Sequence, residues 1–222
     1  GIEKQGDRIA LVEESGKTHT YSKLVKEADQ LAKPLRDFKG LLALEAANEL
    51  EPILALIGAC RAGCPILLVG EGDLDSKRNL RRDYQPEFEF SRKEGSWALR
   101  KNGVSLDDKI HPELAILLST SGSTGSSKQV RLSHENLRSN GLSIIEYLGI
   151  EDTERAMTTL QFNYSFGLSV ISSHLHAGAS ISLTSKSVLE DEFWAQFERQ
   201  NVTSVSGVPR SFEILSKSGF LD

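Results

Sequence analysis

Short apolar runs alternate with longer amphipathic stretches along most of the chain. The runs Leu41–Leu44 and Ile66–Val69 have the length and composition of buried strands. Between them, the apolar stretch Pro52–Ala62 has the length of a helix, and Gly63 follows it as a helix stop. Two strands joined through a helix are typical of a parallel pair, because parallel strands need a long crossover connection. The pattern therefore predicts an α/β fold, with a mostly parallel sheet covered by helices.

The same alternation continues on both sides of this unit. Before it, residues 8–12 and 18–21 read as the two strands of a hairpin, and a helix follows with Ser22 as its cap. After residue 113, Ser133 is a predicted helix cap, and further elements are expected as strands over 114–118, 129–132, 155–160, 179–183 and 203–206, and as helices over 134–148, 167–177, 191–200 and 209–217.

Residues 71–112 differ from the rest of the chain. They are polar, they carry both signs of charge, and their apolar pieces are short, such as Phe88–Phe90. A linker between independent domains would be richer in Pro, Gly and Ser. We therefore expect a polar excursion that connects two halves of one sheet.

Composition and charge exclude several classes of function. The chain has 222 residues, and its 26 Lys and Arg against 31 Asp and Glu give a net charge of −5, without the cation cluster that nucleic-acid binding needs. The longest apolar stretch, Ile53–Cys60, is far shorter than the roughly 20 residues of a membrane span. Cys60 and Cys64 have no further metal-ligating residues nearby and read as reduced core thiols. Because no charged and then apolar leader opens the chain, we expect a cytoplasmic protein.

One loop concentrates residues that suit a polyphosphate. After the apolar run 114–118, residues 120–128 read Thr-Ser-Gly-Ser-Thr-Gly-Ser-Ser-Lys. Glycine lets backbone N–H groups approach a ligand closely, hydroxyls donate further hydrogen bonds, and Lys128 adds a positive charge. The alternative is a flexible Ser/Gly surface loop, which composition alone favours. The position of the loop between two apolar strands favours phosphate binding.

Two common phosphate-binding motifs do not fit this loop. A Walker loop needs glycine before its lysine, a hydroxyl after it and an immediate helix. Here Ser127 precedes Lys128, Gln129 follows it, and the chain continues as a strand. The G-x-G-x-x-G motif also fails, because Gly122 and Gly125 are three residues apart.

The loop and the segment Ser133-His134-Glu135-Asn136-Leu137 together resemble the phosphate-loop signature of the adenylate-forming, or AMP-binding, enzymes. This superfamily includes acyl-CoA and aryl-CoA ligases, nonribosomal-peptide adenylation domains and luciferases. Three further segments resemble family motifs in the same order, namely Thr20–Leu24, Ala59–Pro65 and Gly207–Pro209. The resemblance covers nearly all of residues 1–222 but only the front part of the large N-terminal domain of these enzymes.

The resemblance implies a ligase that works in two steps. A carboxylate attacks the α-phosphate of MgATP, pyrophosphate leaves, and the acyl-adenylate passes to a thiol of coenzyme A or of a carrier protein. In such enzymes the loop would hold the β- and γ-phosphates, and Lys128 would act catalytically by stabilising charge on the departing pyrophosphate. The implied ATP-binding residues are Thr120, Ser121, Gly122, Ser123, Thr124, Gly125 and Lys128.

A second segment, Leu160–Gly167, resembles the part of the family that faces the acyl group. Taken alone, its aromatic residues read as a core cluster at the start of a helix. The resemblance instead assigns Tyr164, Phe166 and Gly167 to the substrate site, with Tyr164 as an aromatic wall. Asn163 is comparable with an aspartate that holds the amino group in amino-acid-activating relatives, and a neutral amide is a weak partner for an ammonium group.

The remaining polar residues have simpler explanations. His174 and His176 are two apart on an expected helix and so point to different faces, which argues against a metal site. The later family motifs, Y-G-x-T-E, T-G-D and a C-terminal domain with its catalytic lysine, are absent from these 222 residues. We therefore expect an N-terminal piece of an acyl-CoA-synthetase-like enzyme of fatty acid metabolism, inactive by itself. The alternative is a non-catalytic nucleotide-binding module or pseudoenzyme.

Overall fold

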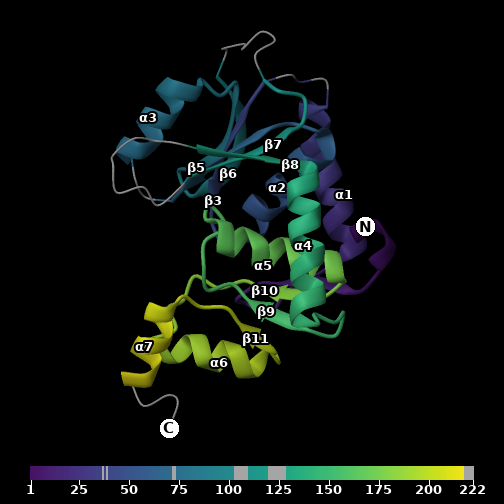
Figure 1. Ribbon diagram of the computed structural model, residues 1–222, viewed down its shortest axis with the longest axis vertical. Helices are drawn as coiled ribbons and strands as arrows, with labels where there is room; N and C mark the ends of the chain where they lie inside the picture. The colour runs from purple at the N-terminus through teal and green to yellow at the C-terminus, as the bar shows by residue number, and fades with distance from the viewer. Residues whose placement is uncertain (37, 39, 72–73, 103–109, 120–128, 218–222) are drawn as a thin grey trace.

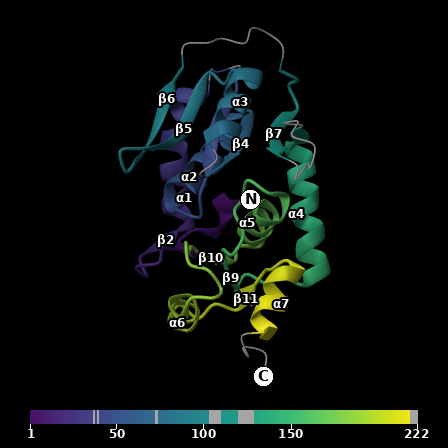
Figure 2. The same cartoon turned by 90° about the vertical axis from the view of Figure 1, so that its left-hand side faces the viewer.

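The computed structural model describes residues 1–36, 38, 40–71, 74–102, 110–119 and 129–217. In this part of the chain, two mostly parallel sheets pack against helices (Figure 1), and a second view shows the two sheets one above the other (Figure 2). The predicted α/β fold class is confirmed, but the strands are divided between two sheets instead of forming one.

The larger sheet has six strands in the order β6-β5-β3-β4-β7-β8. Its four inner strands are parallel, and an antiparallel strand closes each edge. The parallel strands are β3 (Leu42–Ala46), β4 (Ile66–Gly70), β5 (Phe88–Lys93) and β7 (Leu114–Ser119), and the edge strands are β6 (Ser96–Lys101) and β8 (Gln129–Ser133).

The smaller sheet has five strands in the order β11-β9-β10-β1-β2. Leu11 lies opposite Ile181 in a parallel pair, so the first strand of the chain belongs to a sheet whose other parallel strands follow residue 154. The strands are β1 (Ile9–Val12), β2 (Thr18–Thr20), β9 (Arg155–Met157), β10 (Ser180–Ser182) and β11 (Ser204–Val205), of which β2 is antiparallel to β1.

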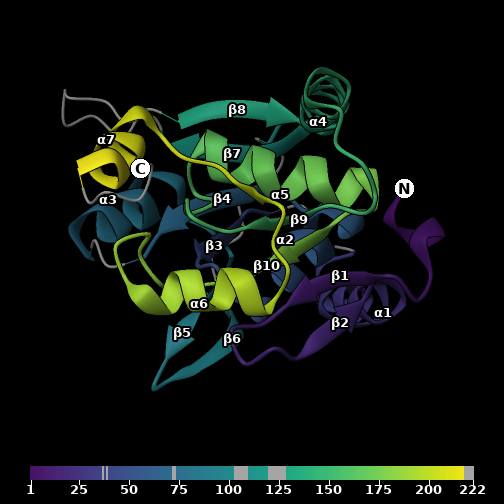
Figure 3. The same ribbon diagram turned by 90° about the horizontal axis from the view of Figure 1, so that it is seen from below.

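The helices are α1 (Tyr21–Ala32), α2 (Leu50–Ala62), α3 (Leu74–Tyr84), α4 (His134–Leu148), α5 (Ser165–Ala177), α6 (Asp191–Arg199) and α7 (Pro209–Lys217), with 3-10 turns at Ile2–Gln5 and Lys33–Leu35. Helix α5 lies between the two sheets (Figures 1 and 3). One core cluster contains Leu44 and Ile116 of the larger sheet together with Ile181 of the smaller sheet. The two sheets therefore share one core.

The segment 71–112 differs from the expected polar excursion. It contributes helix α3 and the hairpin β5–β6, and β5 pairs in parallel with β3 inside the larger sheet. The charged helix is held on the sheet by ion pairs, since Lys77 Nζ lies 2.8 Å from Glu45 Oε1 and Arg81 pairs with Glu89. Leu80 of α3 is also buried in an apolar cluster on the sheet, but charged residues dominate the rest of the helix, so the segment reads as polar in the sequence.

The first helix begins earlier than its sequence suggests. Thr20 is the N-cap, and its Oγ1 accepts a hydrogen bond from Lys23 N at 3.3 Å, so Ser22 is not the cap as predicted. Tyr21 starts the helix instead of ending the strand, and it is fully buried. Its hydroxyl donates to the carbonyl oxygen of Ala179 at 2.6 Å. Local sequence patterns do not reveal this contact, because Ala179 is distant in the chain.

Both cysteines are unpaired. Burial raises the pKa of the Cys60 thiol and of the Cys64 thiol to about 12, so neither is a thiolate at neutral pH. Within the described residues, no helix has both the length and the apolar character needed to cross a membrane.

Substituting alanine at two helical glycines should change stability in opposite directions. A Cβ at Gly58 of α2 would lie 2.7 Å from the carbonyl oxygen of Ala28, whereas the nearest atom to a Cβ at Gly141 of α4 lies 3.8 Å away. We expect Gly58→Ala to lower the free energy of unfolding by about 1–3 kcal/mol, because backbone must move. Gly141→Ala should raise it by about 0.5–1 kcal/mol through helix propensity. Urea denaturation of both variants measures this contrast, and equal effects would contradict the described packing of α1 on α2.

We expect His174 to make the fold sensitive to acid. Burial lowers the pKa of His174, although its Nδ1 lies 2.8 Å from the carbonyl oxygen of Val170. Below the ordinary histidine pKa of about 6.5, the unfolded chain therefore binds a proton that the folded chain does not, and stability falls as the pH falls. Between pH 6.5 and 5.5, His174→Gln should remove up to about 1 kcal/mol of this loss.

His176 is the matched control, because it lies on the same helix but is exposed. Urea unfolding at the two pH values should show the same acid sensitivity in His176→Gln as in the unchanged chain. Retention of the full acid sensitivity by His174→Gln would show that another group causes it.

Candidate functional site

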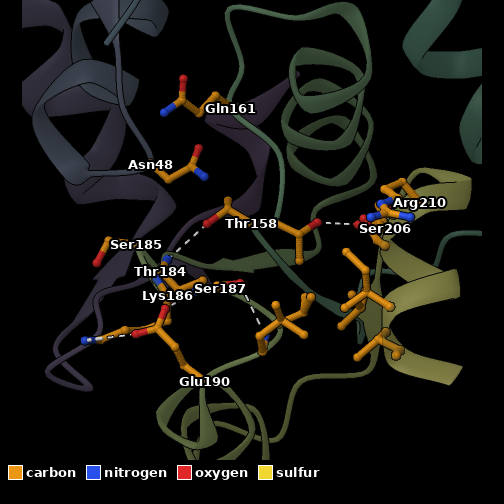
Figure 4. Close-up of a pocket in the computed structure, with 18 of the residues that line it drawn as sticks. Asn48, Thr158, Gln161, Thr184, Ser185, Lys186, Ser187, Glu190, Ser206 and Arg210 are labelled. Atoms are coloured by element: carbon orange, nitrogen blue, oxygen red, sulfur yellow. Dashed lines mark hydrogen bonds and ion pairs between the residues drawn. The ribbon is translucent and has the colours of Figure 1, made fainter. Parts of the chain in front are cut away.

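A cavity of 460 Å³ lies where strands of both sheets end. Its lining residues follow the carboxyl ends of β3, β4, β9, β10 and β11 and include the start of α7. Figure 4 shows amide side chains of Asn48 and Gln161 on one rim, hydroxyl side chains in the middle, and Arg210 beside Ser206 on the opposite side. We call it the strand-end cavity. Open α/β sheets bind ligands at this edge of their strands, so its position favours a ligand site.

Hydrogen bonds between adjacent strand ends fix the floor of the strand-end cavity. Thr158 Oγ1 accepts from Thr184 N at 3.0 Å, and the Thr159 hydroxyl donates to the carbonyl oxygen of Ser206. These contacts join the ends of β9, β10 and β11. The cavity is therefore formed by ordered backbone and short polar side chains.

A second hollow of 660 Å³ lies between the β7–β8 hairpin and helices α4 and α5. Ser119 and Val130 line it at the hairpin, and Tyr164 and Leu168 line it at α5. We call it the hairpin groove. The short turn from Gln161 to Tyr164 separates it from the strand-end cavity, because Gln161 lines one hollow and Tyr164 the other. The two hollows are therefore neighbours.

The helices differ in how their N-termini are satisfied. Side chains of Thr20 and Ser133 cap α1 and α4, and Ser133 forms a full capping box with Asn136. By contrast, α2, α5 and α6 begin next to the two hollows without a side-chain cap hydrogen bond. Acidic residues occupy the first turns of α2 and α6, but none occupies the first turn of α5. Helix α5 thus begins with neither a side-chain cap nor an acidic residue in its first turn, and such a positive end attracts an anion.

The three predicted substrate residues lie at this end of α5. Tyr164 is its N-cap residue, is 51% exposed and lines the hairpin groove. Phe166 is 44% exposed, so it is not a core anchor. Gly167 is buried, and a Cβ there would lie 2.4 Å from the carbonyl oxygen of Gln161. Glycine therefore allows the first turn of α5 to lie against the turn that separates the two hollows.

Asn163 lies in the same turn but is buried. A Cβ on Gly70 at the end of β4 would lie 2.8 Å from Asn163 Nδ2, so the amide packs directly on this glycine. Its Oδ1 is buried, and no hydrogen-bond partner for it is found among the described residues. A buried unpaired carboxylate would be far less stable at this position than a neutral amide.

The predicted ATP-binding residues Thr120, Ser121, Gly122, Ser123, Thr124, Gly125 and Lys128 lie outside the described residues. Their flanks are described, and Ser119 lies in the hairpin groove with Tyr164. This proximity supports the prediction that the loop and Tyr164 serve one site, and the assignment of these residues stays a prediction. The described residues contain no group of three or more His, Cys, Asp or Glu side chains that could hold a metal ion.

Sequence reasoning missed most of the strand-end cavity. Asn48, Thr158, Thr184 and Ser206 are far apart in the chain and are ordinary polar residues in their local context. The available signal was their common position at or near the end of an expected strand. The motif Gly207–Pro209 was recognised, and Gly207 lines the cavity.

Comparison with known proteins identifies the family. The model of the AMP-binding enzyme family matches residues 73–222. Peroxisomal OPC-8:0-CoA ligase 1 of Arabidopsis thaliana is 30% identical over 192 residues, which cover 86% of this chain and 33% of that protein. A nonribosomal peptide synthetase of Gibberella zeae is 26% identical over 106 residues, covering 48% of this chain and 1% of that protein.

Solved structures share the fold of this chain. O-succinylbenzoate coenzyme A synthetase of Bacillus subtilis, solved in complex with ATP and magnesium ion, superposes with a TM-score of 0.76 at 19% identity, covering 96% of this chain and 64% of that one. The chain belongs to the AMP-binding enzyme family. It spans 33% of the length of the curated plant ligase it matches.

Proposed function

We propose that this chain is the front part of a ligase that activates a carboxylic acid with MgATP and passes the acyl group to a thiol. The observation that carries the proposal is the pair of neighbouring hollows separated by the turn from Gln161 to Tyr164. Such a pair suits a reaction between two ligands whose reacting atoms must meet.

The polarity of the site suits two anions. In the proposed arrangement the phosphates of ATP bind Thr120–Lys128, the residues that follow Ser119. The acid passes Tyr164 at the turn between the two hollows and extends into the strand-end cavity. Its carboxylate lies near the N-terminus of α5, whose first turn has no acidic residue. An oxygen of the carboxylate attacks the α-phosphorus, the bond to the bridging oxygen breaks, and its electron pair leaves with pyrophosphate.

Several parts of this proposal draw on relatives. The Arabidopsis relative is named a CoA ligase and the Gibberella relative a nonribosomal peptide synthetase, so both coenzyme A and a carrier-protein thiol are candidate acceptors. Fatty acids are one candidate substrate class. We assign no residue to Mg²⁺, which enters as the complex with ATP.

Lys128 should matter for turnover and not for folding. In the full-length protein we expect Lys128→Ala to slow carboxylate-dependent exchange of pyrophosphate into ATP by a factor of about 30–1000, equivalent to about 2–4 kcal/mol of lost charge stabilisation. Lys23→Ala is the matched control, because Lys23 is an exposed lysine whose partner is Glu27 on its own helix. Normal exchange by Lys128→Ala would remove this residue from the proposed mechanism.

The same assay tests the function itself. A panel of fatty, aromatic and amino acids should include at least one that supports exchange by the full-length protein, whereas residues 1–222 alone should show none, because positioning groups worth about 7–11 kcal/mol are missing. Binding of ATP without exchange for any acid would favour a nucleotide-binding module or pseudoenzyme. Exchange by residues 1–222 alone would contradict the expected inactivity.

Tyr164 should affect the substrate and leave stability unchanged. Because its side chain is half exposed, Tyr164→Ala should change the free energy of unfolding by less than about 0.5 kcal/mol. Loss of an aromatic wall should nevertheless raise KM for the acid about tenfold or more. Tyr147→Ala is the control for an exposed aromatic residue, since Tyr147 of α4 is 87% exposed and lines neither hollow. An unchanged KM in Tyr164→Ala would contradict the substrate assignment.

A further inference from the structure

One wall of the strand-end cavity is held by a residue that does not line it. Residues 184–190, which follow β10, form this wall. Glu14 lies in the turn between β1 and β2, some 170 positions away in the sequence, and is not among the lining residues. It nevertheless contacts the wall directly, because β1 pairs with β10.

A single carboxylate oxygen of Glu14 receives three hydrogen bonds from the wall. Glu14 Oε1 accepts from the backbone N of Ser185, from the Ser185 hydroxyl at 2.7 Å and from the Thr184 hydroxyl at 3.4 Å. Burial raises the pKa of Glu14, but the hydrogen bonds from Ser185 outweigh it, and the net pKa is lowered. The carboxylate is therefore ionised at neutral pH, and hydrogen bonds to an ionised group are the stronger kind.

The turn that carries Glu14 is itself fixed. Gly16 N donates to the carbonyl oxygen of Glu13 at 2.8 Å, and Glu13 N donates to the carbonyl oxygen of Lys17 at 2.9 Å. Gln200, the C-cap residue of α6, also holds the turn, since its Nε2 donates to the carbonyl oxygen of Glu13 at 2.8 Å. Glu14 thus connects a rigid turn to the cavity wall.

The contact with Glu14 sets the path of the wall beyond Ser185. Lys186 N donates to Thr184 Oγ1 at 3.1 Å, and Ser187 N donates to Glu190 Oε1 at 2.6 Å. Each of these bonds depends on the direction in which the backbone leaves Ser185. The placement of the Lys186 and Ser187 side chains around the cavity (Figure 4) therefore depends on the bonds to Glu14.

We propose that Glu14 is a positioning residue that fixes the 184–190 wall of the strand-end cavity and thereby sets the affinity for the acid substrate. The inference rests on the proposed function, because it takes this cavity as the site of the acid. It concerns binding of the acid and not the chemical step, since Glu14 touches neither hollow. The nucleotide side, across the turn from Gln161 to Tyr164, should be unaffected.

The test compares Glu14→Ala and Glu14→Gln with Glu13→Gln in the full-length protein. Pyrophosphate exchange is measured for the acid that the panel identifies, with KM for the acid, KM for ATP and kcat determined separately. Glu14→Ala should raise KM for the acid about tenfold or more, with kcat and KM for ATP within about threefold. Glu14→Gln keeps an oxygen acceptor and should rescue part of the loss. Glu13→Gln, in the same turn but bonded to His19 and Lys17, should match the unchanged protein.

A second measurement keeps the two proposals separable. Hydrogen–deuterium exchange on residues 1–222 should show faster exchange of the amides of 184–187 in Glu14→Ala than in Glu13→Gln. If no acid supports pyrophosphate exchange, the proposed function fails, and faster amide exchange alone would still support the positioning of the wall. An unchanged KM for the acid, an equal loss in kcat and both KM values, or unchanged amide exchange would overturn the inference.

Discussion

The parallel pairing of β1 with β10 is the contact on which the smaller sheet and its cavity depend. It places Leu11 opposite Ile181 and Val12 opposite Ser182, and it brings residues from the start of the chain beside strands that form after residue 154. Non-local pairs of this kind cost chain entropy before they give stability. Burial of the core that both sheets share, with α5 between them, offsets this entropy cost. The turn after β1 then reaches the wall of the strand-end cavity.

Local patterns predicted the elements that are built from local contacts. Gly63 ends α2 in the left-handed conformation, and Ser133 caps α4 with a capping box, as the sequence indicated. The apolar runs around Leu44 and Leu68 are the central strands of the larger sheet. Periodicity could not reveal that the strands divide into two sheets, because it says which residues are buried and not which strands pair.

The features that the sequence did not predict depend on contacts between residues far apart in the chain. Helix α3 has few apolar residues, and ion pairs such as Lys77 with Glu45 hold it on the sheet. Glu14 reads as a charged turn residue until β10 brings Ser185 to it. Tyr164 was predicted from family resemblance; it lines the hairpin groove with Ser119, and its role toward the substrate stays a prediction. The strand-end cavity needed coordinates, since its residues share only the place where their strands end.

A crystal structure of the full-length protein with MgATP and an acid that supports exchange tests the central claim most directly, because it locates both ligands at once. The account predicts phosphates bound along Thr120–Lys128, the acid in the strand-end cavity, and the two reacting groups meeting at the N-terminus of α5. That helix begins at the turn between the two hollows and has no acidic residue in its first turn, so it is the expected meeting point. An acid bound outside the strand-end cavity, with Tyr164 far from both ligands, would contradict it.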